Sequence, residues 1–295
     1  MQPGQREFDN LRRLLAPARE EDLGGGDVTG SLLPRDAEAE AKFVSRCPLV
    51  FCGGAFLDTI ARAYDAAIQT TVLAGEGASV EAGSVLARWR GRVCPILAAE
   101  RVALNFLQRL GGVATATRRY VDAVAGTAAA IYDTRKTTPG WRDLEKYAVR
   151  AGGGRNHRMG LYDAVLVKDN HLAVLARSGC EDPIAALADA LRQVRARLGA
   201  EGFVELEVDT LDQLRSALAL PVNVVLLDNM PPAQMRQAVK MRDGAGLRGR
   251  VELEASGGVT LANVRGVART GVERIAVGAL THSAAAVDIG LDVEA

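Results

Sequence analysis

The sequence predicts an α/β fold whose core is an open or incomplete parallel βα barrel over about residues 128–280. Short β-rich apolar runs alternate there with helical patterns, which is typical of βα units and a parallel sheet. The runs are 129–134, 164–168, 203–209, 223–228, 251–256 and 274–278, and helical patterns cover 180–198, 210–219, 231–242 and 260–270. Six clear strands fit an open barrel better than a complete eightfold one. A doubly wound sheet is the alternative, but no G-x-G-x-x-G motif opens a helix after any strand.

The N-terminal part of the chain carries shorter and more varied patterns. Apolar spacing over residues 7–16 predicts a helix, and three glycines at 24–26 follow it. The next patterns predict a half-buried strand, a helix and a group of short strands, over 38–45, 55–68 and 72–91. Residues 95–123 form a long helical pattern, which we expect Gly111 and Gly112 to interrupt.

Composition and charge exclude several classes of protein. The 36 basic and 36 acidic side chains cancel, so the chain lacks the basic surplus of a duplex nucleic-acid binder. No apolar run approaches the roughly 20 residues that span a bilayer, and the first residues do not resemble a secretory signal. No C-x-x-C pair is present, so we interpret the cysteines as structural: Cys47, Cys52, Cys94 and Cys180. These features favour a cytoplasmic protein with no membrane or nucleic-acid partner.

Polar or glycine residues follow each predicted barrel strand. They are 133–136, 168–171, Glu207 with Asp209, Asp228 with Asn229, 256–258 and 278–279. Because the carboxyl ends of barrel strands converge on one face, where active sites lie, we expect these residues to form one site. A single charged strand end is usually a solvated loop, but six in succession favour a functional site.

The basic members of this set indicate an anionic substrate. Arg135, Lys136, Arg158 and Lys168 form a cationic group, which His157 joins when protonated or supplements as a neutral donor. Arginine matches carboxylates and phosphates bidentately, so the group predicts a substrate with several negative charges. The alternative is a set of salt bridges with local acids. Of the other histidines, His171 and His282, we expect structural roles more than ligand roles.

Acidic residues and glycines complete the predicted site. Glu207 and Asp228 are suited to holding magnesium, binding sugar hydroxyls or stabilising a developing positive centre. Glu205, Glu207 and Asp209 alternate along one strand, so we expect all three to point inward. Backbone amides at Ser256-Gly257-Gly258 and Gly278-Ala279 are candidates for a phosphate site, the alternative being simple tight turns.

The motifs that carry these residues resemble those of the quinolinate phosphoribosyltransferases. The most specific segment is DTRKTTPGWRDLEKYAVRAGGGRNHRMGLYDAVLVKDNH at 133–171. Nearly the whole chain is covered, because further motifs follow in order: EDLGGGDVT (21–29), AAERVALNFLQRLGGVAT (98–115), LEVDTLDQL (206–214), VVLLDNM (224–230), EASGGVT (254–260) and VGALTHS (277–283).

The resemblance implies an activity and a domain organisation. It implies that quinolinate and phosphoribosyl pyrophosphate, with Mg2+, give nicotinate mononucleotide, pyrophosphate and carbon dioxide in de novo NAD synthesis. It also implies an N-terminal α/β sandwich domain over 1–110, completed by about 281–295, and an open-barrel catalytic domain over 111–280.

The resemblance further implies roles for individual residues. The quinolinate carboxylates would be bound by Arg135, His157, Arg158 and Lys168, next to Thr134. Lys136 would lie near the ribose and pyrophosphate, and Glu207 and Asp228 would contact ribose hydroxyls or magnesium. The phosphate would be held by Ser256, Gly257, Gly258, Val277, Gly278 and Ala279. The family is dimeric, and Arg101 would reach the quinolinate of the neighbouring subunit.

Three other functions fit parts of the sequence. A homologous protein of molybdate-transport operons is one, but the intact cationic group argues against it. A Schiff-base barrel lyase with Lys168 as its nucleophile is another, although it leaves the other cations and the glycine motifs unused. A barrel that only binds a partner predicts missing site residues, and none is missing.

Overall fold

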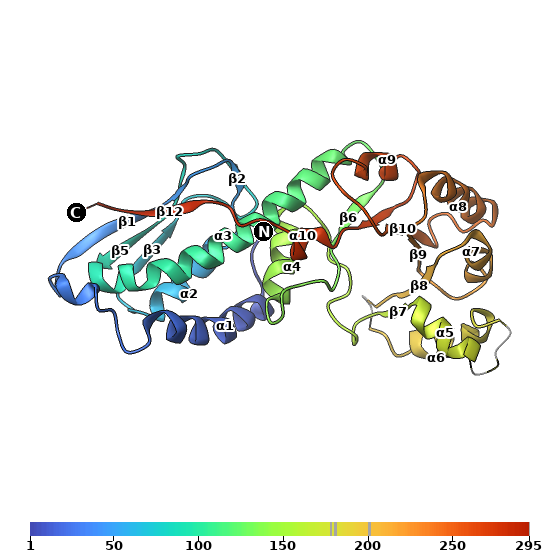
Figure 1. The fold of residues 1–295 in the computed structure, drawn as a ribbon, viewed down its shortest axis with the longest axis horizontal. Coiled ribbons are helices and arrows are strands. Elements are labelled where there is room, and N and C mark those ends of the chain that lie inside the picture. Colours follow the sequence, from blue (N-terminus) through green and yellow to red (C-terminus); the bar gives the residue numbers. More distant parts are fainter. Residues whose placement is uncertain (178, 180–181, 200–201, 295) are drawn as a thin grey trace. The chain divides into compact units, whose positions relative to one another are not determined.

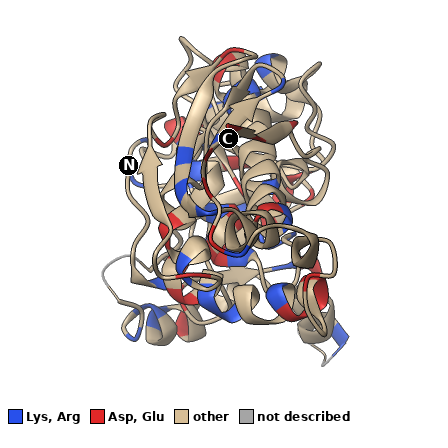
Figure 2. Ribbon diagram, turned by 90° about the vertical axis from the view of Figure 1, so that its left-hand side faces the viewer, with Lys and Arg blue, Asp and Glu red and all other residues tan. Residues whose placement is uncertain are grey.

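A computed structural model describes residues 1–177, 179, 182–199 and 202–294. The chain divides into two compact units (Figure 1). The N-terminal unit comprises Met1–Arg118, Lys136–Gly154 and Leu280–Ala295, and the barrel unit comprises Arg119–Arg135 and Arg155–Ala279. Basic and acidic residues are interspersed along the ribbon (Figure 2), so any cationic site must be local.

The barrel unit contains one parallel sheet of six strands in the order β6-β11-β10-β9-β8-β7. These strands are β6 (Ala130–Tyr132), β7 (Val165–Val167), β8 (Val204–Val208), β9 (Val224–Asp228), β10 (Glu252–Ser256) and β11 (Arg274–Ala276). Every predicted run therefore contains a strand, and the predicted open parallel barrel is confirmed. The sheet ends at β6 and β7, which do not pair with each other among the described residues.

Helices follow most of these strands, as a βα arrangement requires. They are α5 (Asp169–Arg177), α6 (Ala188–Arg195), α7 (Leu211–Ala217), α8 (Pro232–Gly244) and α9 (Val264–Ala268), with a 3-10 turn at Ala185–Leu187. Thr210 starts α7 with a capping box, since its hydroxyl accepts the Gln213 amide and the Gln213 side chain accepts the Thr210 amide. The predicted helix over 180–198 begins at residues that lie outside the described part.

The N-terminal unit is built on an antiparallel sheet with the order β12-β1-β5-β3. Its strands are β1 (Glu38–Ser45), β3 (Gln69–Val72), β5 (Val85–Arg92) and β12 (Ile289–Glu294), and β2 (Leu49–Val50) pairs separately with β4 (Ser79–Val80). The last strand pairs with β1 from Glu40 opposite Glu294 to Ser45 opposite Ile289. Strand β12 therefore lies in the same sheet as β1, although about 240 residues separate them in the sequence.

Five helices accompany this sheet, of which the sequence predicts three, over 7–16, 55–68 and 95–123. They are α1 (Gln5–Leu23), α2 (Leu57–Arg62), α3 (Val93–Ala123), α4 (Arg142–Ala151) and α10 (Ala279–His282). The helix predicted over 55–68 stops at Arg62, and downstream the Asp65 carboxylate accepts the Ala67 amide in an Asx turn. The predicted interruption at Gly111 and Gly112 is wrong, because α3 continues through both glycines.

The two glycines in α3 serve close packing. A Cβ on Gly111 would lie 2.9 Å from a Val287 methyl group. A Cβ on Gly112 would lie far inside van der Waals distance of the Ala285 carbonyl oxygen. The segment before β12 therefore rests directly on the α3 backbone, which explains why residues with poor helix propensity occur in this helix.

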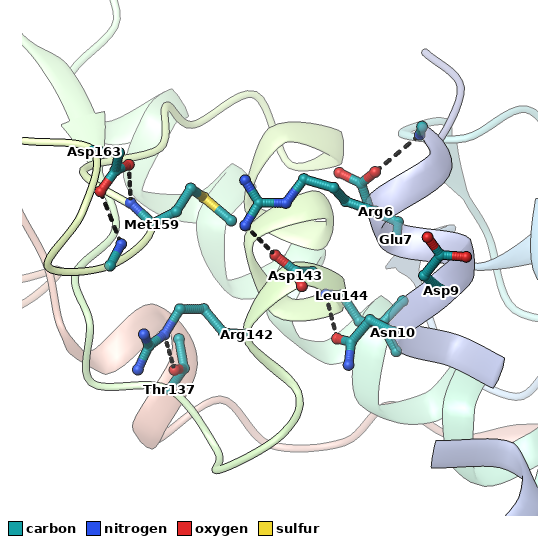
Figure 3. Close-up of polar contacts among 12 residues, drawn as sticks. Arg6, Glu7, Asp9, Asn10, Thr137, Arg142, Asp143, Leu144, Met159 and Asp163 are labelled. Carbon is teal, nitrogen blue, oxygen red and sulfur yellow. Dashed lines mark hydrogen bonds and ion pairs between the residues drawn. The ribbon is translucent and has the colours of Figure 1, made fainter. Parts of the chain in front are cut away.

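Residues 136–154 fall within the predicted barrel segment but belong to the N-terminal unit by their contacts. Figure 3 shows polar contacts that join α4 to α1. The Arg6 guanidinium lies 3.2 Å from the Asp143 carboxylate, and the Asn10 amide donates to the Gly140 carbonyl at 2.6 Å. Asn10 also accepts the Leu144 amide, so one buried side chain satisfies two backbone groups.

None of the described helices is both long and apolar enough to cross a membrane. The described cysteines, Cys47, Cys52 and Cys94, are free thiols. Burial raises the pKa of the Cys52 thiol, which makes it a poor nucleophile and agrees with a structural role. Cys180 lies outside the described residues.

We predict that Gly112→Ala destabilises the protein by about 1–3 kcal/mol, because the added methyl group overpacks the contact with Ala285. Gly266→Ala is the matched control, since Gly266 lies inside α9 and its added methyl group would meet nothing within 4 Å. The control should match or slightly exceed the wild-type stability. Urea unfolding measures both, and equal stability of the two variants would contradict the packing role.

Candidate active site

Two arginines of the barrel unit, Arg135 and Arg158, lie close together, and each has a buried nitrogen with no hydrogen-bond partner among the described residues. Arg158 is 7% exposed, and its Nη1 donates to the Ala164 carbonyl at 3.2 Å. Burial, followed by the nearby positive charge of Arg135, lowers the pKa of Arg158. The Nε atoms of both arginines are buried and have no hydrogen-bond partner in the described part of the chain. An anion between the two guanidinium groups would satisfy both donors and relieve their repulsion.

Lys168 joins these arginines at the end of β7. Its Nζ lies 3.4 Å from the Glu207 carboxylate, with the Lys168 side chain 47% and the Glu207 side chain 10% exposed. Burial raises the pKa of Glu205, and the charges of Arg158 and Lys168 oppose this effect, so both cations lie near the same carboxylate. We call Arg135, Arg158 and Lys168 the cationic cluster. The ion pair with Glu207 stabilises the charged ammonium, whereas a Schiff-base nucleophile requires the neutral amine.

A parallel bridge brings His157 and Arg158 to this cluster. Tyr132 of β6 pairs with Arg155, so the segment that starts at Arg155 runs along the edge of the sheet. The Asp133 carboxylate then accepts the His157 amide at 2.8 Å. Beyond Arg158, the Asp163 carboxylate accepts the amides of Met159 and Gly160 and closes the loop, as Figure 3 shows for Met159.

His157 is buried and both ring nitrogens are engaged. Its Nε2 lies 2.7 Å from a Glu205 oxygen, and its Nδ1 accepts the backbone amide of Arg158 at 2.8 Å. The other two histidines are exposed, as Nδ1 of His171 accepts the Lys168 amide and Nδ1 of His282 lies 2.6 Å from the Ser283 hydroxyl.

The sequence reasoning missed two buried residues behind His157. Arg274 Nε donates to Glu254 at 2.6 Å, and Glu254 lies 3.6 Å from His157 Nε2. Burial raises the pKa of Glu205 and of Glu254 to about 7 each. We call His157, Glu205, Glu254 and Arg274 the buried charge cluster. A sequence pattern could have identified Glu254. It lies two residues after Glu252 on one strand, just as Glu207 lies two residues after Glu205 on another, so each pair shares one face of the sheet.

Within the described residues, only His157, Glu205 and Glu254 lie close enough together to form a three-donor metal site. The Arg274 guanidinium already supplies a positive charge to these carboxylates. A metal ion would compete with that guanidinium, so the cluster is better explained as a set of internal ion pairs.

The inward direction predicted for β8 holds for two of its three acids. Glu205 and Glu207 are buried within the strand, but Asp209 is exposed and lies past its last residue, Val208. The prediction for Asp209 is therefore wrong, because strand alternation no longer applies after the strand ends. Burial raises the pKa of Glu207, Lys168 opposes this effect, and the Asp228 carboxylate reinforces it.

The glycine motif after β10 needs glycine for steric reasons. Gly257 and Gly258 have φ values of +92° and +59°, which disfavour other residues. A Cβ on Gly257 would also collide with the Asn229 side chain. Asn229 itself has a positive backbone φ of +51°. Strand pairing sets Ser256 of β10 beside Asp228 of β9. The loop that carries the predicted phosphate site is thus fixed next to a predicted acidic residue.

The remaining predicted residues are placed less directly. Val277 is 1% exposed and its amide donates to the Tyr132 carbonyl, while Gly278 and Ala279 follow β11. Thr134 lies between β6 and Arg135. Arg101, on α3, and Lys136 belong to the N-terminal unit and have exposed side chains.

Burial of Glu254 predicts a pH-dependent stability. Its pKa is 4.5 in an unfolded chain and about 7 when folded, so the folded protein retains a proton that the unfolded chain releases. The stability present below pH 4.5 is therefore lost as pH rises toward 7. We expect the free energy of unfolding to fall between about pH 5 and pH 8 by on the order of 2 kcal/mol more in the wild type than in Glu254→Gln.

Urea unfolding at the two pH values gives this difference. Glu252→Gln is the matched control, because Glu252 lies on the same strand with its side chain 45% exposed. The control should keep the wild-type pH dependence, and an identical slope in all three proteins would contradict the prediction.

Comparisons with known proteins agree with this fold and this arrangement of residues. Two models of the quinolinate phosphoribosyl transferase match, the N-terminal domain over residues 27–111 and the C-terminal domain over 113–292. The nicotinate-nucleotide pyrophosphorylase (carboxylating) of Mycobacterium leprae is 42% identical over 97% of this chain and 98% of its own. A probable enzyme of that name from Bacillus subtilis is 38% identical over 96% of this chain and 93% of its own.

Solved structures give the same result. The nicotinate-nucleotide pyrophosphorylase of Francisella tularensis superposes with a TM-score of 0.88 at 35% identity, covering 100% of this chain and 99% of that one. One from Ehrlichia chaffeensis gives a TM-score of 0.83 at 35% identity, over 96% of this chain and 98% of that one. The chain therefore belongs to the quinolinate phosphoribosyltransferase family.

Proposed function

We propose that this protein converts quinolinate and phosphoribosyl pyrophosphate to nicotinate mononucleotide, pyrophosphate and carbon dioxide, a step of NAD biosynthesis. The observation that carries the proposal is the cationic cluster, with two buried and unpartnered Nε donors on adjacent arginines. Quinolinate is a dicarboxylate, and its two neighbouring carboxylates suit two guanidinium forks.

The charges of the barrel unit match such a substrate. Arg135, Arg158 and Lys168 carry three positive charges, and the ion pair with Glu207 offsets one of them. The two positive charges that remain equal in number the two negative charges of the substrate carboxylates. In this proposal Arg135 and Arg158 bind the carboxylates bidentately, and Lys168 adds a charge-assisted hydrogen bond.

The phosphoribosyl group is assigned to the neighbouring strands. We assign its phosphate to the backbone amides of Gly257, Gly258, Gly278 and Ala279, with the Ser256 hydroxyl. We assign the ribose hydroxyls to Glu207 and Asp228, which is supported by the pairing of β8 with β9 and by that of Asp228 with Ser256, next to this loop. Lys136, on the N-terminal unit, is assigned to the pyrophosphate.

Magnesium fits Glu207 and Asp228 by the chemistry of their donors. Burial and the Asp228 charge raise the pKa of Glu207, so a cation here would relieve an unfavourable negative charge. Mg2+ commonly binds one or two carboxylates together with substrate phosphates. When bound, it would offset the charge that develops on the departing pyrophosphate.

The proposed reaction begins as the bond between the anomeric carbon and pyrophosphate breaks, with the electron pair leaving on oxygen. Glu207 and Asp228 stabilise the oxocarbenium character of that carbon, and the quinolinate nitrogen, held by the cationic cluster, forms the new bond. The resulting pyridinium accepts the electron pair of the adjacent carbon–carboxylate bond, and carbon dioxide leaves. A proton then adds to the ylid-like carbon, with water and Lys136 as the candidate donors.

The family resemblance supports a homodimer in which Arg101 completes the site of the other subunit. The cytoplasmic location and the absence of nucleic-acid and membrane partners stay predictions.

The function is tested by incubating the protein with quinolinate, phosphoribosyl pyrophosphate and magnesium and measuring nicotinate mononucleotide. We expect product, and no product when EDTA removes the metal. Folded protein that forms no product under the complete conditions would refute the proposal.

Lys168→Met tests the cationic cluster. Loss of a charge-assisted hydrogen bond should raise KM for quinolinate about 10- to 100-fold and leave KM for phosphoribosyl pyrophosphate within about twofold. Lys240→Met is the matched control, because Lys240 is an exposed lysine of α8. Equal KM values in both variants would remove Lys168 from the quinolinate site.

The shared site is tested by mixing two impaired variants, Arg101→Ala and Lys168→Ala, at a low quinolinate concentration at which each variant alone has little activity. Random subunit exchange makes about half of the dimers mixed, each with one intact site, so about a quarter of the wild-type activity should return. Each variant alone is the control. Mixed dimers that remain inactive after verified exchange would argue for sites formed within single subunits.

A further inference from the structure

The hydrogen bonds of His157 define its protonation state. Its Nδ1 lies 2.8 Å from the backbone nitrogen of Arg158, which can only donate, so Nδ1 must be the acceptor. The proton of the ring therefore resides on Nε2, which donates to Glu205 at 2.7 Å. An imidazolium would direct a second N–H at the Arg158 amide. The ring is thus a neutral imidazole with each nitrogen engaged inside the barrel.

The Glu205 carboxylate lies near charged side chains of two other barrel strands. Glu205 belongs to β8, Glu254 to β10 and Arg274 to β11, and the pairing of β10 with β11 sets Glu254 directly beside Arg274. The Arg274 guanidinium also lies over the Tyr132 ring, 4.0 Å from its centroid. Side chains on paired strands move little, so the Nε2 end of His157 has a rigid anchor.

Resting on the proposed function, we propose that His157 is a positioning residue that fixes Arg158 for the dicarboxylate and is not itself a ligand of quinolinate. The Arg158 backbone is held by Nδ1 of His157, and its guanidinium by the Ala164 carbonyl. The Asp133 carboxylate accepts the backbone amide of His157, the residue before Arg158. An arginine held at both ends loses little entropy when it binds an anion.

This assignment changes the charge of the quinolinate site. His157 adds no positive charge, because the neutral ring is required by its contact with Arg158. Within the barrel unit the dicarboxylate is then bound by arginine and lysine side chains without His157, namely Arg135, Arg158 and Lys168. Binding of a substrate carboxylate to His157 would require breaking one of two buried hydrogen bonds.

The first test reads the ring directly. The 15N and 1H signals of the histidine rings are recorded by NMR, free and saturated with quinolinate, and the His157 signals are identified among three histidines by their absence in His157→Asn. We expect the neutral form with the proton on Nε2 in both states. An imidazolium pattern, or the proton on Nδ1, would overturn the proposal. The ligand-free spectrum remains informative even if the protein forms no nicotinate mononucleotide, so failure of the proposed function is separately visible.

The second test uses two substitutions that differ in one contact. In His157→Asn the amide oxygen can replace Nδ1 as the acceptor of the Arg158 amide, whereas His157→Leu has no acceptor. We expect KM for quinolinate to rise less than about threefold in the first and at least about tenfold in the second. KM for phosphoribosyl pyrophosphate should stay within about twofold in both.

The control is His282→Asn, an exposed histidine outside the barrel unit, for which both KM values should stay at the wild-type level. Equal loss in His157→Asn and His157→Leu would indicate a direct substrate contact and overturn the proposal, as would no loss in either. If His157→Leu does not fold, the wild-type spectra and His157→Asn still decide, because a threefold or larger rise in the asparagine variant contradicts it.

Discussion

Parallel register is the constraint on which the rest of the barrel unit depends. Each strand pairs with its neighbour in the same direction, so residues far apart in the sequence end at one edge of the sheet. The same pairing sets Ser256 beside Asp228 at the strand ends and Arg274 beside Glu254 in the interior. One backbone arrangement therefore positions both the predicted substrate contacts and the buried charges behind them.

Charge balance connects the cationic cluster at the strand ends with the buried charge cluster behind it. A buried guanidinium is compensated by Glu205 and Glu254, and the same carboxylates anchor the neutral ring of His157. Closer to the strand ends, burial and then the positive charge of Arg135 lower the pKa of Arg158. The interior carries its own counter-charges, although Arg274 Nη2 and the Oε1 atoms of Glu205 and Glu254 have no hydrogen-bond partner in the described part of the chain. Among the described residues, the outer cationic cluster forms an ion pair only at Lys168 and is left for an anionic ligand. Family membership identifies a dicarboxylate as the chemically suitable ligand.

Glycine has two different uses in this chain. Gly257 and Gly258 adopt left-handed backbone angles that a loop at the end of β10 requires. Gly111 and Gly112 have helical geometry, and what matters there is the space that a side chain would fill. The local sequence does not distinguish these uses, which is why a helix interruption was expected where the helix is continuous.

The sequence alone determined the open parallel barrel, its six strands and the polar residues at their ends, because strand periodicity and strand-end polarity are local properties. It also indicated family membership through ordered motifs. Only the tertiary structure decided that residues 136–154 join the N-terminal unit, that Asp209 is exposed, and that Arg274 and Glu254 stand behind His157. These facts depend on contacts between segments distant in sequence, and the neutral state of His157 depends on a single hydrogen bond whose geometry no sequence pattern records.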